Sequence, residues 1–387
     1  MIVHPISGVH VINTKFVLII LAALFSVEVM SHQGEVFAQS ENVFLHPDKF
    51  YKKFFPTLKI KPNPPDTAYI KTYPNFLSVG VHVLSPAIHI RIDSKSDKAA
   101  NVDASSQLRT NIVDILGFAA TYRFVSIGFA VLVNSRLHSH DDYAPSKYRT
   151  ATIKYSSSAY SLQFKYLRFQ GFTDINSFNK TNPDVKYVKR SDLTNKEFQF
   201  EGLYNFNWKK YSYTAPLTFS QRQIKSQAGF LLKGGVYYNQ MVSDSILLTP
   251  KQQLYYDNMK DVKGIQTLSF KLAPGVGYTF VFRKRIYLSV SAFTSFDLSV
   301  YKYLSLAGED TDGKQSFIFE LDGKASLGYQ SKRFFAGLRF EAERREALFQ
   351  SIQINTIYSY VGVEVGYRFN TPRFIRKVYK KTMPPGM

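Results

Sequence analysis

Apolar and polar residues alternate along much of the chain. Between Ile286 and Val300 the even positions are mostly aliphatic or aromatic, whereas the odd positions are mostly serine. A period of two residues predicts an extended strand with one apolar and one polar face. The alternation recurs in segments 267–282, 317–330 and 334–343. Such segments exceed the ~5–6 residues usual in soluble sheets and reach the ~9–11 that cross a membrane at a tilt.

The composition of the two faces favours a membrane barrel over a soluble sheet. Phe, Tyr and Leu crowd the apolar face of nearly every strand, while small residues and charges share the other face. This arrangement is typical of transmembrane barrels, in which closure pairs every backbone group. We therefore predict an all-β fold, a transmembrane antiparallel up-and-down β-barrel. A secreted soluble β-domain is the alternative, because alternation also occurs in soluble sheets.

Alternating short turns and long loops give the number of strands. Short turns are expected on the periplasmic side and long loops outside the cell. The connection from Trp208 to Ser226 is interpreted as irregular; as a hairpin it would raise the count to fourteen. Pro274 lies within a strand and predicts a bulge or a local break there. The twelve predicted strands span residues 75–92, 108–122, 125–133, 148–156, 159–171, 197–207, 227–241, 264–282, 286–302, 316–330, 333–345 and 351–369.

The first residues have the pattern of a secretory signal peptide. The apolar run from Phe16 to Val27 follows Lys15 and is shorter than the ~20 residues of a spanning helix. Ala38 is a small residue suited to the cleavage point; a membrane anchor is the alternative. We therefore divide the chain into a signal peptide (1–38), a basic periplasmic leader (39–74), an outer-membrane barrel (75–369) and a basic periplasmic tail (370–387). The predicted localisation is the cell outer membrane.

Basic residues are concentrated at the predicted periplasmic rim. The chain has 49 Lys and Arg residues against 29 Asp and Glu residues, a formal net charge of +20. They gather in the leader, at Lys209-Lys210, at Arg283-Lys284-Arg285 and in the tail. They suit anionic lipid headgroups or an acidic periplasmic partner, with ordinary solvated turns as the alternative. No nucleic-acid partner is expected, because an export signal is present and no binding module is recognisable.

The last strand and two other segments resemble known proteins. The strand from Ile357 to Phe369 ends on an aromatic residue, like the signal that the barrel-assembly machinery of bacteria recognises. We therefore expect that machinery and outer-membrane lipid as partners. Pro65-Asp66-Thr67-Ala68-Tyr69-Ile70, the segment from Ser220 to Leu232, and Gly366-Tyr367-Arg368-Phe369 together resemble a Bacteroidetes family of exported proteins, domain-of-unknown-function family 4421. The resemblance covers about residues 66–369. It implies an outer-membrane location and carries over no functional residues.

Turn geometry predicts ion pairs inside the barrel. Pairing of Phe282 with Ile286 across their short turn places Lys271 opposite Asp297. On the next hairpin, pairing of Tyr329 with Phe334 places two charged residues of one strand diagonally near two of the other. The predicted ion-pair residues in the barrel interior are Lys271, Asp297, Asp322, Lys324, Arg339 and Glu341.

The apolar residues of the first strand change phase. Its valines from Val79 to Val83 occupy odd positions, whereas its isoleucines from Ile88 to Ile92 occupy even positions. We predict a one-residue bulge at Ser85-Pro86, because a bulge inserts one unpaired residue and tolerates proline. The bulge would keep both runs on the outer side. With the last strand included, the predicted polar residues of the interior are His82, His89, Arg91, Glu364 and Arg368.

Candidate chemistry is sparse. The absence of cysteine excludes disulfide scaffolds, thiolate metal sites and cysteine nucleophiles, and no cofactor is expected. A divalent metal could bind His138, His140 and Asp141 in a predicted outer loop; a solvated loop is the alternative. No catalytic residue is assigned, because the sequence has neither a phosphate-binding glycine loop nor a nucleophile elbow.

These observations favour an outer-membrane barrel of unknown specific role. It would be a binding or structural barrel, or a narrow transport pore. A lipid-modifying outer-membrane enzyme is the alternative, for which His138 or His140 would have to serve as the base.

Overall fold

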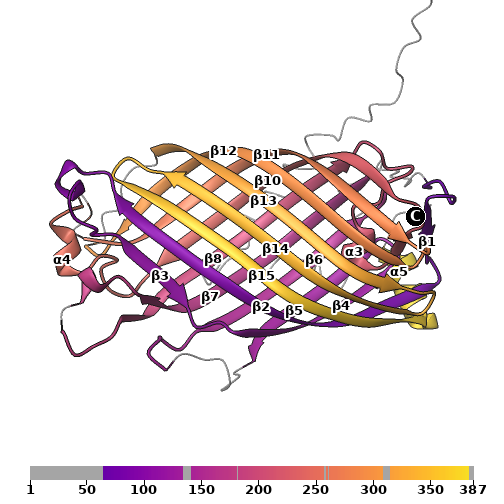
Figure 1. The fold of residues 1–387 in the computed structure, drawn as a ribbon, viewed down its shortest axis with the longest axis horizontal. Coiled ribbons are helices and arrows are strands. Elements are labelled where there is room, and N and C mark those ends of the chain that lie inside the picture. Colours follow the sequence, from indigo (N-terminus) through magenta and orange to yellow (C-terminus); the bar gives the residue numbers. More distant parts are fainter. Residues whose placement is uncertain are drawn as a thin grey trace, which may run out of the picture. The chain divides into compact units, whose positions relative to one another are not determined.

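Antiparallel strands form a closed barrel in the computed structural model (Figure 1). The structure describes residues 64–133, 141–180, 182–256, 259, 261–307 and 314–382. β15 pairs with β2 along its whole length and so closes the wall. In order around the wall, the twelve strands are β2 (Phe76–Ser94), β4 (Asp114–Tyr122), β5 (Val125–Val133), β6 (Lys147–Ser156), β7 (Tyr160–Asp174), β8 (Val188–Asn205), β10 (Gln227–Val242), β11 (Val262–Phe282), β12 (Ile286–Ser305), β13 (Lys314–Gln330), β14 (Phe334–Leu348) and β15 (Ile352–Asn370). We call the barrel interior the lumen.

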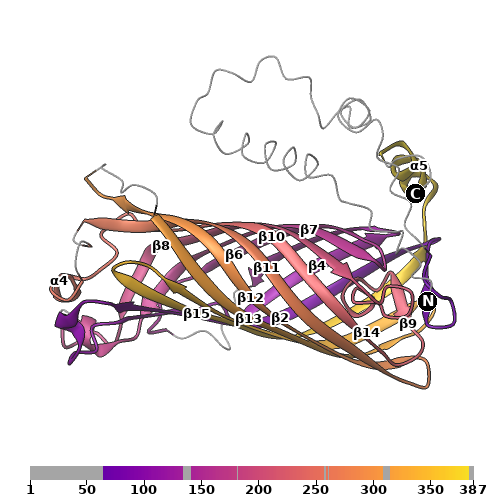
Figure 2. The ribbon, with the colours of Figure 1, turned by 90° about the horizontal axis from the view of Figure 1, so that it is seen from above.

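The remaining barrel elements lie at its two ends. At the end with the short turns, β1 (Ile70–Thr72) pairs with β9 (Gln221–Gln223), and α3 (Ala215–Thr218) precedes β9. The long loops at the other end hold α4 (Pro250–Gln253) and two short 3-10 helices, η3 (Asp97–Ala99) and η4 (Ser177–Asn179). Figure 2 shows β9 and α4 at opposite ends of the barrel.

A last helix, α5 (Arg373–Thr382), follows the barrel in the sequence and belongs to a separate unit of the chain. It is rich in lysine and arginine, and Phe374 and Val378 are exposed on it one turn apart. Within the described ranges, no helix is both long enough and apolar enough to span a membrane.

The predicted strand count of twelve is confirmed, and residues 206–226 form an irregular connection instead of a barrel hairpin. β8 begins at Val188, well before the predicted residue 197. Apart from Val188 and Leu193, residues 188–196 are polar or charged. The strand therefore lacks the apolar alternation there that marks the other strands.

β3 (Ser106–Thr110) is an additional strand at the long-loop end. It pairs with β2 on one side and with β7 on the other. After a break at residues 111–113, the chain continues as β4, which pairs with β2 and β5. The predicted strand 108–122 is thus divided where it changes its partner. β4, β5 and β6 lie between β2 and β7 only in the part of the wall that β3 does not occupy, and they are therefore short.

Pro274 interrupts one ladder without shifting the register. β11 pairs Pro274 with Leu232 of β10 in an unbroken series. In the ladder between β11 and β12, Leu272 and Gly275 are paired with residues of β12, whereas the two residues between them are unpaired. The predicted local break is therefore present, and the bulge is not.

The predicted bulge in β2 is wrong. β2 pairs with β15 in a single register along its whole length, through Pro86. The valines up to Val83 therefore face outward, whereas Ile88, Ile90 and Ile92 face the lumen and are buried.

His89 and Arg91 consequently lie on the exposed outer face of β2, and their predicted place in the lumen is also wrong. The Arg91 guanidinium forms ion pairs at 2.8 Å with Asp93 and at 3.2 Å with Asp103. All of these groups meet solvent near the long loops.

An apolar core inside the long-loop end explains the change of phase. Inward residues from most strands pack there with residues of the loops, such as Leu247, Leu248 and Tyr256. β7 shows the same reversal, because Leu167 and Phe169 are inward and buried in this core. Inward apolar residues are stable at this end because the folded loops remove them from water.

A glycine permits the change of partner in β7. The register of β7 against β8 shifts between Gln170 and Phe172, where β7 leaves β6 and joins β3. Gly171 lies at the shift with φ +86°. A Cβ on this residue would lie 2.1 Å from the carbonyl oxygen of Pro145. Only glycine fits this backbone without strain.

We expect Gly171→Ala to lower the free energy of unfolding by about 1–3 kcal/mol, because it adds left-handed strain and a steric contact. Urea unfolding of the refolded barrel in detergent measures the change. Gly128→Ala is the matched control, because its Cβ would meet its nearest atom, the Phe118 carbonyl oxygen, at 3.7 Å. Equal stability of the two variants would contradict the assignment.

Candidate functional site

A cavity of about 270 Å³ lies in the lumen between the two ends of the barrel. We call it the chamber. Small inward residues of β4 and β5 leave room on one side of the lumen: Ala119, Thr121, Ser126, Gly128 and Ala130. Long charged side chains of β8, β10, β11, β13, β14 and β15 project from the opposite wall. The chamber is therefore displaced toward β4, β5 and β6.

Every carboxylate that lines the chamber forms an ion pair. Buried charges are costly unless they are paired, so a network of this kind is required in a barrel interior that holds so many of them. The pairs are Lys271–Glu320 (2.5 Å), Lys324–Glu341 (3.1 Å), Arg339–Glu364 (2.5 Å), Arg345–Glu343 (3.2 Å), Lys233–Glu201 (3.9 Å) and Lys233–Asp322.

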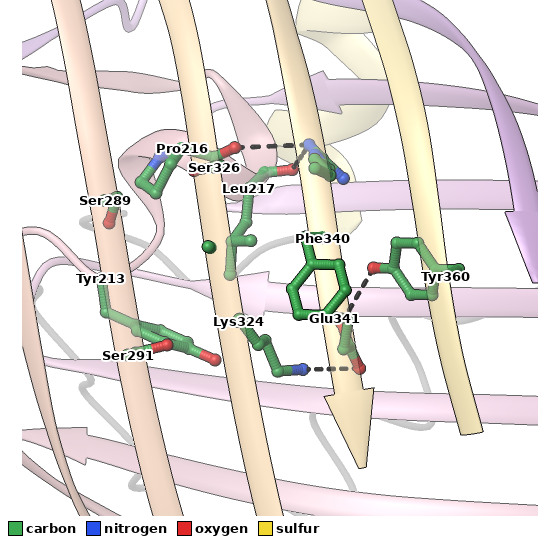
Figure 3. Close-up of a pocket in the computed structure, with 12 residues that line it drawn as sticks. Tyr213, Pro216, Leu217, Ser289, Ser291, Lys324, Ser326, Phe340, Glu341 and Tyr360 are labelled. Carbon is green, nitrogen blue, oxygen red and sulfur yellow. Dashed lines mark hydrogen bonds and ion pairs between the residues drawn. The ribbon is translucent and has the colours of Figure 1, made fainter. Parts of the chain in front are cut away.

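Figure 3 shows one node of this network at the edge of the chamber. Lys324 and the hydroxyl of Tyr360 both reach the Glu341 carboxylate, the hydroxyl at 2.8 Å. Tyr213 and Leu217, which come from the connection between β8 and β10, lie beside them. These three residues of the network therefore lie next to the segment that occupies the short-turn end of the lumen.

The first predicted register is confirmed, and it leads to a different ion pair. Lys271 lies opposite Asp297, as the turn predicts. The Lys271 ammonium binds Glu320 on the next strand but one, whereas Asp297 accepts a hydrogen bond from Ser295 at 2.8 Å. Pairing of neighbours in the sheet does not decide which charge a long side chain reaches across the curved interior.

The second predicted register differs from the structure by two residues. Tyr329 pairs with Ala336 instead of Phe334, because the turn after Gln330 is closed by hydrogen bonds between Ser331 and Phe334. A shift of two residues keeps every side chain on its face. Lys324 and Glu341 are consequently directly opposite each other in adjacent strands.

Of the predicted polar residues of the lumen, His82 and Glu364 line the chamber. The His82 ring lies over Gly117, where a Cβ would come within 1.9 Å of Nε2. Arg368 lies outside the chamber, at the short-turn end, and is fully buried. Its guanidinium donates to the Phe219 carbonyl at 2.8 Å and to Gln330 Oε1 at 3.0 Å.

Residues 206–226, which we call the end plug, occupy the short-turn end of the lumen. Tyr211 is fully buried against two glycines of the wall, Gly229 and Gly277. A Cβ added to Gly229 would lie 2.4 Å from an atom of Tyr211, and one added to Gly277 would lie 2.1 Å from another. Burial raises the pKa of Tyr211, so its phenol stays protonated. Phe219 stacks on Phe335 of β14, with ring centroids 4.1 Å apart. The wall is thus shaped to hold this segment.

The loop with α4 covers the other end. The single hydroxyl proton of Tyr256 is shared between the carbonyls of Ile92 at 2.8 Å and Ala104 at 3.1 Å, and burial raises the pKa of Tyr256. Gln252 donates to Ser106 Oγ at 2.8 Å. These contacts bind the loop to β2 and β3, over the apolar core.

Only one of the three predicted metal ligands lies in the described part of the chain. His138 and His140 lie outside the described residues. Asp141 is exposed, and its backbone carbonyl accepts a hydrogen bond from Lys189 at 3.1 Å. Among the residues that the structure describes, no group of three His, Cys, Asp or Glu is arranged to hold a metal.

A closed antiparallel wall with an apolar outside and a polar lumen defines a barrel of the outer-membrane protein type. The chain belongs to the family described as Domain of unknown function (DUF4421), whose model matches residues 64–369. No curated protein matches the chain.

Solved structures resemble the chain in architecture. The outer membrane protease OmpT from Escherichia coli is 8% identical with a TM-score of 0.33, over 77% of this chain and 98% of that one. The translocator domain of autotransporter NalP from Neisseria meningitidis is 13% identical with a TM-score of 0.34, over 76% and 88%. The β domain of the Bordetella autotransporter BrkA is 10% identical with a TM-score of 0.32, over 76% and 100%. No function follows from similarity at this level.

Two lysines of the chamber are not among the residues predicted from the sequence. Lys154 on β6 and Lys165 on β7 project into it from the side opposite the ion-pair network. Both occupy the polar face of an alternating strand, which could have identified them as inward residues. No acidic residue lies near them in either strand, so a search for ion pairs passes over them.

The network can be tested at Lys233. We expect Lys233→Met to cost about 3–5 kcal/mol of unfolding free energy, because Asp322 loses its closest cation in a buried position. Adding Asp322→Asn should restore most of the loss, because the unpaired charge is removed. Urea unfolding measures both. Lys332→Met, in an exposed turn, is the control; a double variant no more stable than Lys233→Met would contradict the pairing.

Proposed function

We propose that this protein is an outer-membrane barrel closed at both ends, which binds a ligand in its chamber instead of conducting solutes through an open pore. The observation that carries the proposal is that the chain itself occupies both ends of the lumen. The end plug fills one end, and the apolar core with the α4 loop fills the other. A narrow pore would need a continuous polar path, which these segments interrupt.

The apolar outward face of the wall favours a location in the membrane over a secreted soluble domain. Large apolar side chains are exposed around the wall, among them Phe230, Phe296 and Phe317, each about 70% exposed. Soluble proteins rarely expose contiguous apolar surface on this scale. Hydrocarbon provides the surroundings that such a belt requires.

The reversal of the two faces supports a membrane boundary near the long loops. Along β2 the outward residues are apolar up to Val83 and polar from His89 onward. On β8 the outward face changes from Phe198 to Lys196. A strand that passes from lipid into water needs this change, and beyond it the apolar residues gather inside.

The basic residues support contact with anionic lipid or an acidic partner on the periplasmic side. α5 has exposed apolar residues on one stripe and lysine and arginine around it, a pattern typical of helices that lie on membrane surfaces. The turn from Arg283 to Arg285 adds three positive charges beside the short-turn end of the wall.

Closure at both ends makes a specific prediction about conductance. In planar bilayers the purified protein should give no steady current. Replacing residues 208–224 with a short Gly-Ser turn, or shortening the loop 244–260, should leave the barrel silent, because the other end stays filled. The variant with both changes should conduct.

Circular dichroism and heat-modified migration in gels provide the folding control for these variants. Steady conductance of the unmodified protein would overturn the closed-barrel proposal in favour of a pore.

The orientation predicts which sites antibodies reach. An epitope inserted at Asn182, in the loop after η4, should be labelled on intact cells, because long loops face outward from the cell. An epitope after Met387 should be labelled only after the outer membrane is opened. Labelling of the C-terminal epitope on intact cells would reverse the orientation and remove the periplasmic partner.

A further inference from the structure

The chamber has an uneven distribution of paired and unpaired charges. On the network side, each carboxylate and each of four basic residues, Lys233, Lys271, Lys324 and Arg339, has an ion-pair partner. Lys154 and Lys165 on the other side make neither an ion pair nor a hydrogen bond with any residue in the described part of the chain. Both lysines are half-buried and line the chamber.

The register brings the two lysines together. Lys154 pairs with Gln163, and Thr152 pairs with Lys165, so the lysines are diagonal neighbours on one face. Diagonal positions are ~7–8 Å apart, within reach of one small molecule between two long side chains. A small anion that lies between the two side chains could therefore contact both ammonium groups.

The surroundings of the two lysines suit a small polar molecule that carries an oxyanion. Thr152 and Gln163 line the chamber beside them and offer hydroxyl and amide donors, and Tyr148 and Tyr358 lie farther along the same cavity. The small residues of β4 and β5 leave the space unoccupied. A volume of about 270 Å³ is close to the lower limit of ~300 Å³ for small-molecule sites.

We propose that Lys154 and Lys165 form a binding site for a small molecule that carries a carboxylate or phosphate group. Charge-assisted hydrogen bonds from two ammonium groups would supply much of the affinity. The inference rests on the proposed closed barrel with a ligand chamber. Tyr213, Leu217 and Phe219 of the end plug line the same cavity, so the ligand would reach it when this segment shifts.

Isothermal titration calorimetry of the full chain in detergent, with inorganic phosphate and with succinate as separate probes, tests the site. We expect saturable binding of at least one probe, and the stronger of the two distinguishes a phosphate ligand from a carboxylate ligand. Lys154→Gln/Lys165→Gln should weaken binding by about 10- to 100-fold, because two charge-assisted contacts are lost. The bound probe should also raise the urea midpoint of the unmodified protein and not of this variant.

Lys196→Gln/Lys263→Gln is the matched control, because it removes two lysines that do not line the chamber. It should bind the probe as the unmodified protein does. Unfolding curves without probe show that both double variants fold. Equal binding by the Lys154/Lys165 variant, or binding of neither probe by the unmodified protein, would overturn the anion site. Bilayer recordings remain silent in both cases if the barrel is closed, so failure of the site is distinguishable from failure of the closed-barrel proposal.

Discussion

Closure of the hydrogen-bonded wall is the constraint on which the rest of the structure depends. Once β15 pairs with β2, each strand residue is assigned either to the outside or to the lumen. The lumen is then a fixed space in which each carboxylate that lines the chamber has a cation beside it, because an unpaired buried carboxylate is costly. The ion-pair network of β8, β10, β11, β13, β14 and β15 is the consequence of that confinement.

Several features of the fold could be predicted from sequence because alternation reports strands directly. The twelve strands have nearly their predicted bounds wherever one face is apolar, and the short turn at Arg283 gives the register of Lys271 and Asp297. Alternation does not say which face is inside. For this reason the pattern alone places the isoleucines of β2 on the outer side, although they belong to the core under the long loops.

The candidate site was harder to predict than the fold. Lys271 lies opposite Asp297 and binds Glu320, so adjacency in the sheet is a poor guide to contacts across a lumen. The chamber itself depends on what β4 and β5 lack, namely large inward side chains. Small inward residues form no recognisable sequence motif. Only closure of the wall places those of β4 and β5 opposite the charged strands.

The three short strands β4, β5 and β6 determine where the barrel is wide enough to hold a cavity. Where β3 bridges β2 and β7, a circuit of the wall crosses ten strands; below it, the circuit crosses twelve. The diameter of a barrel grows with the number of its strands, so this barrel tapers toward the long loops. The narrow part is filled by apolar side chains of the strands together with those of the long loops, such as Leu247 and Leu248. The wider part encloses more volume than its side chains fill, and the chamber lies against the strands that widen it.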